Sequence, residues 1–586
     1  MNTDEDNCTG RVLSRRRFLQ GAGMLGIGVI AAIACGSEEE ERTGSTLDQT
    51  IVRDEDGNLV NGPGEPYSVR TELAQAKAGR ETRRRSLLTF HHFSDFRITD
   101  EESPLRSEWV EECASPISTG AFRPQESLSL QAAAALISQA NSIDHSPVTG
   151  RRLDFALHTG SAADNAQYNE LRWFLDLMDG IAVLPDSGSP AYQGVQDESP
   201  AGAYPDLLSQ AQQEFRPEAL RYPWFAALGN HDVLAQGSVV PTDSVKAIAL
   251  GDQKVLALGE AARDEICQDP AALLAPGSSE VILSDPDTVV AEVSPDRSRR
   301  LLSRKEWVDE HFKTNSAPGP AGHGLSEENR AAGTAYYAAD FGRLSLIVLD
   351  TVNPGGFSTG SIDRAQFQWL EVQLTIRSSA FFDPDGARHT APNEDRLIIV
   401  ASNHGSDALN NPFPDPATNE ERFRGPQLEA MLQRFPNVVL HVTGHSLRHR
   451  IIPRPHPVDR SRGYWEVSTG SPLDYPMQGR LLDIIDNGDG TVSIFSTVYD
   501  TAAALHPGDS KDPTGDDGVN QLDLASIARQ VGMRDPQLNL EASGLGVSDR
   551  NAELLLTAPF DLQASPAPSP TPAPSETPAP SAPEAG

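Results

Sequence analysis

Along the middle of the chain, apolar residues occur in two patterns. Some form short continuous runs with the length of β-strands, and others recur with the period of α-helices. The strand-like segments are short apolar runs, which are typical of strands covered on both faces of a sheet. We predict six such strands, at residues 86–94, 153–160, 222–229, 344–350, 396–404 and 437–445. Their alternation with helical segments predicts an α/β fold.

The helical segments place apolar side chains on one face at intervals of three and four residues. Residues 164–178 and 363–376 are predicted as helices on this basis, and residues 522–533 have a helical pattern as well. Near the C-terminal end, residues 481–498 predict a β-hairpin that turns at an Asn-Gly-Asp-Gly sequence. Residues 552–556 are predicted as a late strand.

The N-terminal residues 1–35 are predicted to be an export signal. The sequence SRRRFLQ at 14–20 precedes an uncharged stretch, which fits a twin-arginine signal. The stretch is short and rich in glycine and alanine, which disfavours a transmembrane helix, although a basic start before a membrane anchor is the alternative. Cys35 follows Ala-Ile-Ala in a way that resembles a bacterial lipoprotein cleavage site, so lipidation is open. We therefore expect export to the periplasm, the outer membrane or the cell surface.

Polar segments flank the predicted folded domain. Residues 36–85 lack a sustained period and indicate a tether. Residues 561–586 form a Pro/Ala/Ser-rich tail that is expected to be extended and disordered. The globular domain is placed at 86–560, with a weakly patterned insertion or cap at about 233–333.

Composition and charge exclude some partners. The 586 residues are 38% hydrophobic and 22% charged, which is ordinary for a globular protein with a large core. The formal net charge of -35 argues against nonspecific binding to nucleic acid, because such binding needs clustered cations. Any anionic substrate must be attracted locally, since the field of the whole molecule repels it.

The four cysteines limit the metal chemistry. If the signal is removed, Cys113 and Cys267 remain, and they either form one disulfide in an oxidising compartment or stay unpaired. Cysteines at these spacings do not build a zinc site of the usual kind.

Five of the predicted strands end in polar groups, and α/β folds commonly build a site from ligands at strand ends. In chain order these ends read SDFR, HTGSAAD, GNHD, SNHG and TGHSLRH. The most informative is GNHD at 229–232, where an apolar run is followed by a glycine and then by Asn230, His231 and Asp232. Loops that present such groups often hold a metal ion.

These ordered strand ends resemble the five motifs of the calcineurin-like metallophosphoesterases, over residues 86–498. Local likeness continues in the sequences HTGSAADNAQYNEL and LDTVNPGG. The resemblance implies an αββα sandwich of two sheets with a long insertion. It also implies two metal ions that share an aspartate, and a metal-bound hydroxide that attacks a phosphoester in line.

The match fails at three positions, all in the first metal shell that the resemblance implies. Arg97 stands where a ligand histidine is expected, Ser161 stands in place of the shared aspartate, and Leu447 replaces the last ligand histidine. Of that shell, Asp95 alone survives. The second shell lacks the shared carboxylate and keeps three ligands: Asn230, His404 and His445.

The arginine decides what the site can hold. Arginine is permanently charged and has no lone pair for a metal, so Arg97 repels an ion at the first position. Its guanidinium either forms a structural ion pair with Asp95 or binds phosphate oxygens through two N–H groups. The resemblance thus implies one divalent transition metal (Fe, Mn or Zn) rather than two, with His231 and Arg97 as the catalytic groups. The alternative for His404 and His445 is that they are core histidines.

Two functions remain open from the sequence. The first is an exported, metal-dependent phosphoesterase that hydrolyses a phosphorylated small molecule or a phosphodiester with one retained metal shell. The second is a catalytically inactive surface protein with the phosphoesterase fold, which binds a ligand or a partner. Neither involves a specific nucleic-acid partner, and both allow attachment to a membrane through a lipid anchor. The sequence does not predict the oligomeric state.

Overall fold

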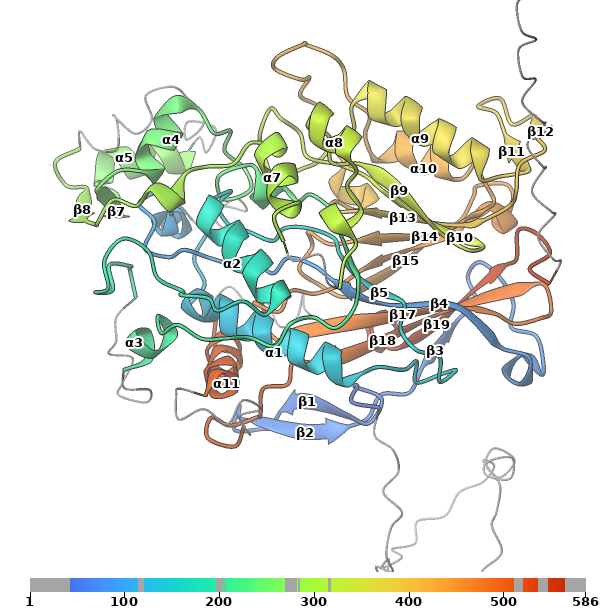
Figure 1. The fold of residues 1–586 in the computed structure, drawn as a ribbon, viewed down its shortest axis with the longest axis horizontal. Helices are drawn as coiled ribbons and strands as arrows, with labels where there is room; N and C mark the ends of the chain where they lie inside the picture. Colours follow the sequence, from blue (N-terminus) through green and yellow to red (C-terminus); the bar gives the residue numbers. More distant parts are fainter. Residues whose placement is uncertain are drawn as a thin grey trace, which may run out of the picture. The chain divides into compact units, whose positions relative to one another are not determined.

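Two large β-sheets, one of seven strands and one of six, lie face to face with helices on their outer sides (Figure 1). The predicted export signal and the Pro/Ala/Ser-rich tail from residue 564 onward lie outside the described residues. The computed structural model describes residues 43–113, 121–196, 204, 206–268, 282, 285–314, 318–510, 520–535 and 546–563.

The seven-stranded sheet combines segments from both ends of the described chain, in the order β3-β19-β18-β17-β4-β5-β6. Strands β4, β5 and β6 are parallel, so their carboxyl ends lie at one edge. The predicted hairpin is confirmed as the antiparallel pair β17 and β18. The strands are β3 (Ser68–Arg70), β4 (Arg85–Phe93), β5 (Phe155–His158), β6 (Trp224–Ala226), β17 (Gln478–Asp486), β18 (Thr491–Asp500) and β19 (Ala552–Thr557).

The six-stranded sheet has the order β15-β16-β14-β13-β10-β9. Its four central strands are parallel, and the two edge strands run antiparallel to their neighbours. The apolar runs that predict strands therefore do form strands in both sheets, with ends shifted by a few residues. The strands are β9 (Tyr337–Phe341), β10 (Leu344–Val348), β13 (Leu397–Ser402), β14 (Val438–Thr443), β15 (Arg450–Arg454) and β16 (Tyr464–Ser468).

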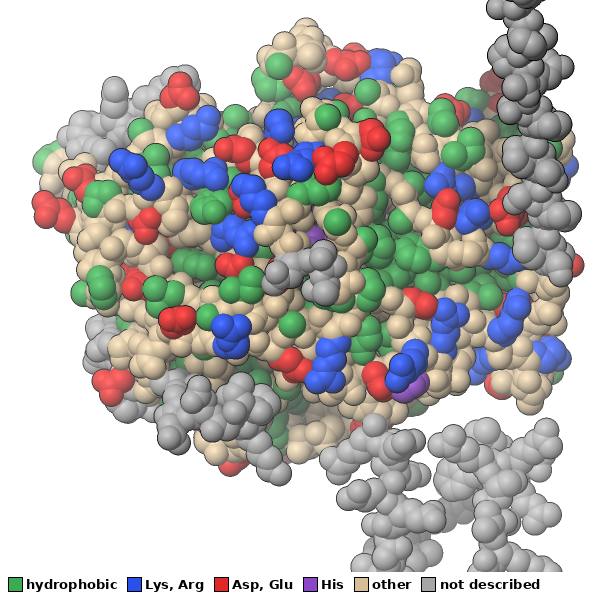
Figure 2. All heavy atoms as spheres, in the orientation of Figure 1, with side chains coloured by type: hydrophobic (Ala, Val, Ile, Leu, Met, Phe, Trp, Pro, Cys, Tyr) green, Lys and Arg blue, Asp and Glu red, His purple; other side chains and the backbone are tan. Residues whose placement is uncertain are grey.

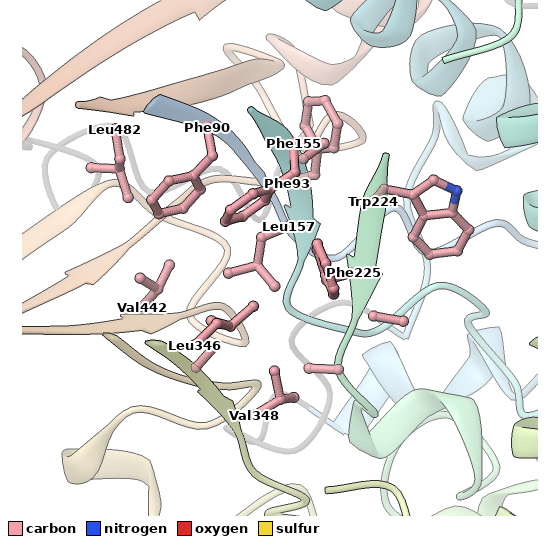
Figure 3. Packing of buried hydrophobic residues seen from close by; sticks show 14 of the residues in the cluster. Phe90, Phe93, Phe155, Leu157, Trp224, Phe225, Leu346, Val348, Val442 and Leu482 are labelled. Atoms are coloured by element: carbon pink, nitrogen blue, oxygen red, sulfur yellow. The ribbon is translucent and has the colours of Figure 1, made fainter. Parts of the chain in front are cut away.

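One apolar core fills the space between the two sheets (Figure 3). The ring of Phe155 in β5 stacks on the ring of Phe341 in β9, with 4.8 Å between their centroids. Figure 3 shows Phe90 of the first sheet and Leu346 of the second on opposite sides of the same core. Burial of such side chains contributes about 1.5–3 kcal/mol each, which is what holds the sheets together.

Helices cover the outer faces of the sandwich. α9 (Arg364–Ile376) and α10 (Gly425–Leu432) pack on the six-stranded sheet through a separate apolar cluster. α1 (Ser129–Ser142) and α2 (Tyr168–Asp179) belong to the main core at the seven-stranded sheet, and α11 (Gln521–Gly532) lies against α1. The predicted α/β sandwich of αββα type is confirmed.

The helix predicted at 164–178 begins later, at Tyr168. Ala166 has a left-handed φ of 58°, which interrupts a right-handed helix. The residues before Tyr168 are therefore left in a loop at the end of β5, where they contribute to the site described below.

Residues 43–85 differ from the predicted tether. β1 (Gln49–Arg53) and β2 (Leu59–Pro63) form a hairpin, and β3 pairs in parallel with β19 at the edge of the seven-stranded sheet. Thr46 is buried, and its N–H and its hydroxyl both donate to the carbonyl of Val498, at 2.9 and 2.8 Å. The polar composition hides all three strands, and the partner of β3 lies hundreds of residues away.

The predicted insertion at 233–333 holds short helices and a two-stranded sheet. Cys267 is disulfide-bonded, so the unpaired alternative does not hold for it. Within the described residues, no helix is both long enough and apolar enough to span a bilayer. The described elements of the insertion are α4 (Asp243–Ala249), β7 (Gln253–Ala257), α5 (Glu260–Gln268), β8 (Val289–Glu292), α7 (Arg304–His311) and α8 (Glu327–Ala332). Outside it, the remaining short elements are α3 (Leu207–Ala211), β11 (Ala380–Phe382) and β12 (Arg388–Thr390).

Candidate functional site at the strand ends

The loops that follow the parallel strands of both sheets meet, and hydrogen bonds join them. The N–H of Asp95 donates to the carbonyl of Gly160 at 2.6 Å, which links the ends of β4 and β5. The side-chain amide of Asn403 donates to the carbonyl of Thr159 at 2.9 Å. The carboxylate of Asp95 accepts the N–H of His445 at 2.7 Å, so the two sheets are tied together here.

The GNHD loop, η5 (Asn230–Asp232), is fixed to the loop after β5 by one carboxylate. Asp232 accepts the N–H groups of Ala162, Ala163 and Gly229 at 2.8, 3.0 and 2.8 Å. Burial raises the pKa of Asp232 to about 7, against the opposing effect of these N–H groups. All three contacts are internal, so Asp232 holds the loop in place and is not directed toward a ligand.

Four non-glycine residues of the first and last motifs have left-handed backbone conformations. Such conformations cost on the order of 1–3 kcal/mol each and persist where the surrounding structure fixes them, often at functional sites. The φ angles are 50° at Asp95, 48° at Arg97, 63° at His445 and 58° at Leu447.

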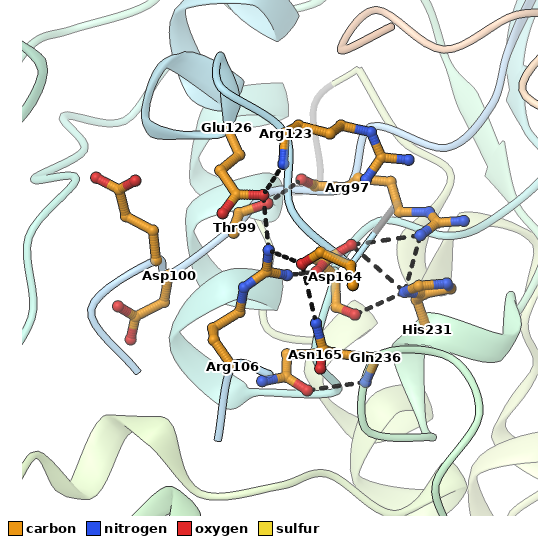
Figure 4. Close-up of polar contacts among 12 residues, drawn as sticks. Arg97, Thr99, Asp100, Arg106, Arg123, Glu126, Asp164, Asn165, His231 and Gln236 are labelled. Atoms are coloured by element: carbon orange, nitrogen blue, oxygen red, sulfur yellow. Dashed lines mark hydrogen bonds and ion pairs between the residues drawn. The ribbon is translucent and has the colours of Figure 1, made fainter. Parts of the chain in front are cut away.

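Arg97 belongs to a polar cluster that is centred on Asp164, and its guanidinium lies beside Asp164 and His231 (Figure 4). Its side chain is buried, and its Nη1 lies 3.3 Å from Oδ1 of Asp164, while its Nε lies 3.6 Å from Oδ1 of Asp95. The predicted pairing with Asp95 is therefore present, and Asp164 is a second partner. Among the described residues, Nη2 of Arg97 makes no hydrogen bond.

A second buried arginine supports Asp164 from the other side. Arg106 is 1% exposed and hydrogen-bonds both Asp164 and Glu126, the latter at 2.6 Å (Figure 4). Burial raises the pKa of Asp164. The charge of Arg106, a hydrogen bond with His231 and the charge of Arg97 outweigh this effect and hold the pKa of Asp164 well below its usual range. Asp164 is therefore a carboxylate shared by two guanidinium groups. Sequence patterns gave no signal for this network, because its members are 58 and 67 residues apart.

His231 is held as a neutral imidazole. Its Nδ1 lies 2.7 Å from the carbonyl oxygen of Asp164 and 3.0 Å from Nη1 of Arg97. We assign the proton to Nδ1, because a carbonyl oxygen can only accept and the shorter contact is to that oxygen. Burial and the charge of Arg97 lower the pKa of His231. Nε2 is then the nitrogen with the free lone pair.

Asn230 presents one oxygen without a partner. Its Nδ2 donates to the carbonyl of Gly237 at 2.8 Å, while its buried Oδ1 has no hydrogen bond among the described residues. Gly237 has a φ of 69°, and a Cβ at this position would lie 2.1 Å from Cδ2 of His231. A glycine is therefore required for this loop to pack against Asn230 and His231.

Both ring nitrogens of His404 are engaged. Its Nδ1 lies 2.8 Å from the hydroxyl of Thr351, and its Nε2 lies 3.0 Å from the carbonyl of Ser358. Since a carbonyl can only accept, Nε2 carries the proton and Nδ1 accepts the Thr351 hydroxyl. Neither nitrogen of His404 has a lone pair left for a metal.

His445 is beside His404, with 4.4 Å between ring centroids. Burial lowers the pKa of His445 to about 3, and the charge of Arg97 acts in the same direction. The buried Nδ1 of His445 has no hydrogen-bond partner among the described residues. His445 is therefore neutral and has one nitrogen available.

These donors do not fit a divalent ion at either position of the two-metal arrangement. At the first position, Oδ1 of Asp95 faces Arg97, and its Oδ2 accepts the hydroxyl of Ser94 and the N–H of His445. At the second, Asn230 and His445 each offer one atom, and Ser161 brings no charge. Within the described parts of the chain, no three His, Cys, Asp or Glu side chains are grouped as a metal site requires. The arrangement does not support the single metal shell that the sequence predicts.

A buried relay behind His404 is a further feature that the sequence did not reveal. The hydroxyl of Ser402 lies 2.8 Å from the carbonyl of His404 and 2.8 Å from Nε2 of His441. Nδ1 of His441 lies 3.3 Å from Oε2 of Glu466. Ser402 and His441 are fully buried and Glu466 is 4% exposed, so these residues position the loop of His404 and do not meet solvent.

The comparisons with known proteins leave the family open. No protein-family model and no curated protein matches the chain. Among solved structures, the chain is similar to purple acid phosphatase PPD1 from yellow lupin (Lupinus luteus) seeds, with 10% sequence identity and a TM-score of 0.26. The matched region covers 76% of this chain and 56% of that one, so the chain spans little more than half of its length. A likeness at this level carries no conclusion about activity, which must come from the site itself.

Proposed function

We propose that this chain is a non-hydrolytic binding protein on a phosphoesterase-type α/β frame. The observation that carries the proposal is the position of Arg97, whose guanidinium occupies the polar cluster between Asp95 and Asp164. A cation fixed by two carboxylates satisfies the charges that a metal would otherwise satisfy. The cluster then stabilises the meeting point of the two sheets without a metal.

Electrostatics explains why a metal and this arginine exclude each other. Two unit charges about 4 Å apart interact with about 4 kcal/mol at an effective dielectric constant of about 20, and a divalent ion doubles this repulsion. In two-metal phosphoesterases a bridging anion offsets such repulsion. Ser161 supplies no such anion, and its buried hydroxyl has no hydrogen-bond partner among the described residues.

Metal content and hydrolysis test the proposal together. Protein purified from the exported fraction should contain far less than one equivalent of Fe, Mn or Zn by elemental analysis. It should not hydrolyse p-nitrophenyl phosphate or bis-p-nitrophenyl phosphate when these metals are added. Near-stoichiometric metal together with chelator-sensitive turnover would overturn the proposal.

A phosphoesterase with one metal is the second candidate, and a specific observation favours it. Oδ1 of Asn230 and Nδ1 of His445 are buried atoms without hydrogen-bond partners among the described residues, and each could offer a lone pair to a metal. If His404 released Ser358 and its proton moved from Nε2 to Nδ1, with the Thr351 hydroxyl turned to accept it, Nε2 would have a lone pair and could join them. Asn230→Ala should then abolish both metal binding and turnover. If the chain is instead a non-hydrolytic binding protein, the variant and the parent should be alike in having neither stoichiometric metal nor turnover.

The partner and the location are proposed from the chain's charge and its N-terminal sequence. The twin-arginine pattern supports export, and replacement of Arg15 and Arg16 by lysine should keep the protein inside the cell. The net charge of -35 supports a partner other than nucleic acid. On the face shown in Figure 2, acidic and basic side chains are interspersed, so that face offers no broad basic patch for a polyanion.

A further inference from the structure

Two phenylalanine rings, Phe357 and Phe413, stack on each other beside the polar cluster at the strand ends. They come from the loops that follow β10 and β13, their centroids are 4.9 Å apart, and their planes lie within 11° of parallel. Phe357 is half-buried, whereas Phe413 is 47% exposed. Since Phe357 covers one face of the Phe413 ring, we assign this exposure mainly to the other face.

Hydrogen bonds connect this aromatic pair to the loops that carry the strand-end cluster. The N–H of Phe357 donates to the carbonyl of Ser238 at 2.7 Å, and Ser238 belongs to the loop that accepts the side-chain amide of Asn230. Ser358 is exposed, and its carbonyl lies 3.0 Å from Nε2 of His404. The aromatic pair therefore lies at the rim of the cluster, on the edge of the sheets where α/β folds bind ligands.

The backbone at Phe357 is strained. Its φ is 67°, a left-handed conformation that glycine adopts freely and a bulky side chain rarely adopts. Residues held in this way persist where the surrounding structure fixes them, and they gather at ligand sites. The buried side chain of Asn411 provides the support, because its amide donates to the carbonyls of Gly356 and Thr359 at 2.9 and 3.0 Å. The loop thus holds a phenylalanine ring at a position that suits glycine.

The two asparagine side chains that brace the aromatic pair are already engaged. The amide of Asn353 donates to the carbonyl of Phe413 and to the hydroxyl of Ser361, and its oxygen accepts the N–H of Gly355. The oxygen of Asn411 accepts the N–H of Phe413 at 3.1 Å. A sugar needs hydrogen-bond partners for several hydroxyl groups, and these amides do not supply them. A flat ring needs the face of Phe413 alone, because aromatic rings attract each other in offset stacks.

The size of the exposed surface disfavours a protein partner. The exposed part of Phe413 is about half of the roughly 200 Å² that an aromatic side chain offers. A stable protein interface buries about 800 Å² on each partner. The net charge of -35 also repels anions. These observations favour a small molecule whose ring is uncharged.

We propose that the aromatic pair binds an uncharged aromatic ring of a small molecule, which stacks on the open face of Phe413. The bound ring extends the stack that Phe357 and Phe413 already form, and it places the rest of the molecule at the rim of the strand-end cluster. This names a ligand class for the proposed binding protein and rests on that function only for the absence of turnover.

A titration with caffeine, a soluble, flat and uncharged ring system, tests the site on the full chain by NMR. We expect saturable binding at one site. Phe413→Leu keeps an apolar side chain but removes the flat face, so it should weaken binding about tenfold, as expected for loss of a stacking side chain. Phe413→Tyr keeps the flat face and should bind within about twofold of the parent. Val458→Ser should leave binding unchanged, because this exposed residue precedes β16 at the opposite edge of the six-stranded sheet.

Phe357→Gly separates binding from stability. Glycine adopts the left-handed conformation without strain, which offsets the lost packing, so the urea midpoint should stay close to that of the parent. Caffeine binding should nevertheless weaken, because the supporting ring is gone. An unchanged affinity for caffeine in this variant would contradict the proposed role of Phe357.

Three results would overturn the proposal: no saturable binding of caffeine, equal weakening by Phe413→Leu and Phe413→Tyr, or tighter binding of methyl β-D-glucopyranoside than of caffeine. The second result would indicate general apolar adsorption, and the third would indicate a sugar site. Hydrolysis of a phosphoester is measured separately. It would overturn the proposed function, whereas the caffeine titrations would still decide the aromatic site.

Discussion

Replacing Arg97 by methionine tests whether the strand-end cluster is a structural ion network. Removing one partner of a buried ion pair typically costs about 3–5 kcal/mol, because the other charge is left buried and unpaired. Here the loss is moderated, since Asp164 keeps Arg106 and the carboxylate of Asp95 keeps the hydroxyl of Ser94 and the N–H of His445. We therefore expect Arg97→Met to lower the free energy of unfolding by about 3 kcal/mol, at the lower end of that range.

Urea unfolding, followed by circular dichroism, measures this loss. Arg450→Met is the matched control, because Arg450 and its partner Asp407 are both 55% exposed and an exposed pair contributes about 0–1 kcal/mol. A second comparison uses Asp95→Asn. The double variant Arg97→Met/Asp95→Asn should recover part of the loss, since the uncompensated carboxylate is removed with the arginine.

The reasoning fails if Arg97→Met costs no more than Arg450→Met. It also fails if Arg97→Met by itself takes up a stoichiometric divalent ion and becomes more stable with it. In that case the arginine would be an obstacle to an otherwise complete metal shell. The absence of recovery in the double variant would show that Asp164, and not Asp95, is the partner that matters.

Asp232→Asn should lower the free energy of unfolding by about 2–4 kcal/mol, because one amide oxygen cannot replace a carboxylate that accepts three N–H groups; an unchanged urea midpoint would contradict the role of Asp232 as a tie between loops. The pKa of Glu102 is raised to about 7 in the folded protein, so its contribution to stability is fully present below the unfolded pKa of about 4.3 and is lost as pH rises toward about 7. The difference in the free energy of unfolding between the parent and Glu102→Gln should therefore fall as pH rises through this range, whatever the other groups contribute to both proteins; a difference that does not change with pH would refute the assignment. The triple change Arg97→His, Ser161→Asp and Leu447→His should bind a divalent ion that EDTA removes, whereas Arg97→His alone should not, because the ligands of a shell act as a unit; elemental analysis distinguishes the two.

The sheets could be predicted because their central strands are continuous apolar runs. Residues 396–404 and 437–445 contain β13 and β14, which are fully buried and parallel, so composition and structure agree there. β3 could not be found in this way. Its three residues, Ser-Val-Arg, carry no strand signal, and they form a strand because β19, almost 500 residues later, offers them a free edge.

The site was predictable to the extent that its motifs are local. The residues of GNHD and the two histidines after β13 and β14 lie where the sequence places them. The state of each ring was not predictable, because it depends on distant groups. His404 is engaged by Thr351 and Ser358, which lie 53 and 46 residues away, and no pattern around His404 indicates this.

Asp95 shows how the strand-end cluster keeps its shape through contacts within the protein. Its Oδ2 binds the N–H of His445 and the hydroxyl of Ser94, and its backbone N–H binds Gly160, so one residue joins three loops and both sheets. Hydrogen bonds to a charged group contribute about 1.5–3 kcal/mol each, which is comparable to the cost of about 1–3 kcal/mol for each left-handed residue nearby. Arg97 then places a positive charge beside this buried carboxylate, with its Nε 3.6 Å from Oδ1 of Asp95. The left-handed loops are thereby stabilised by contacts within the protein.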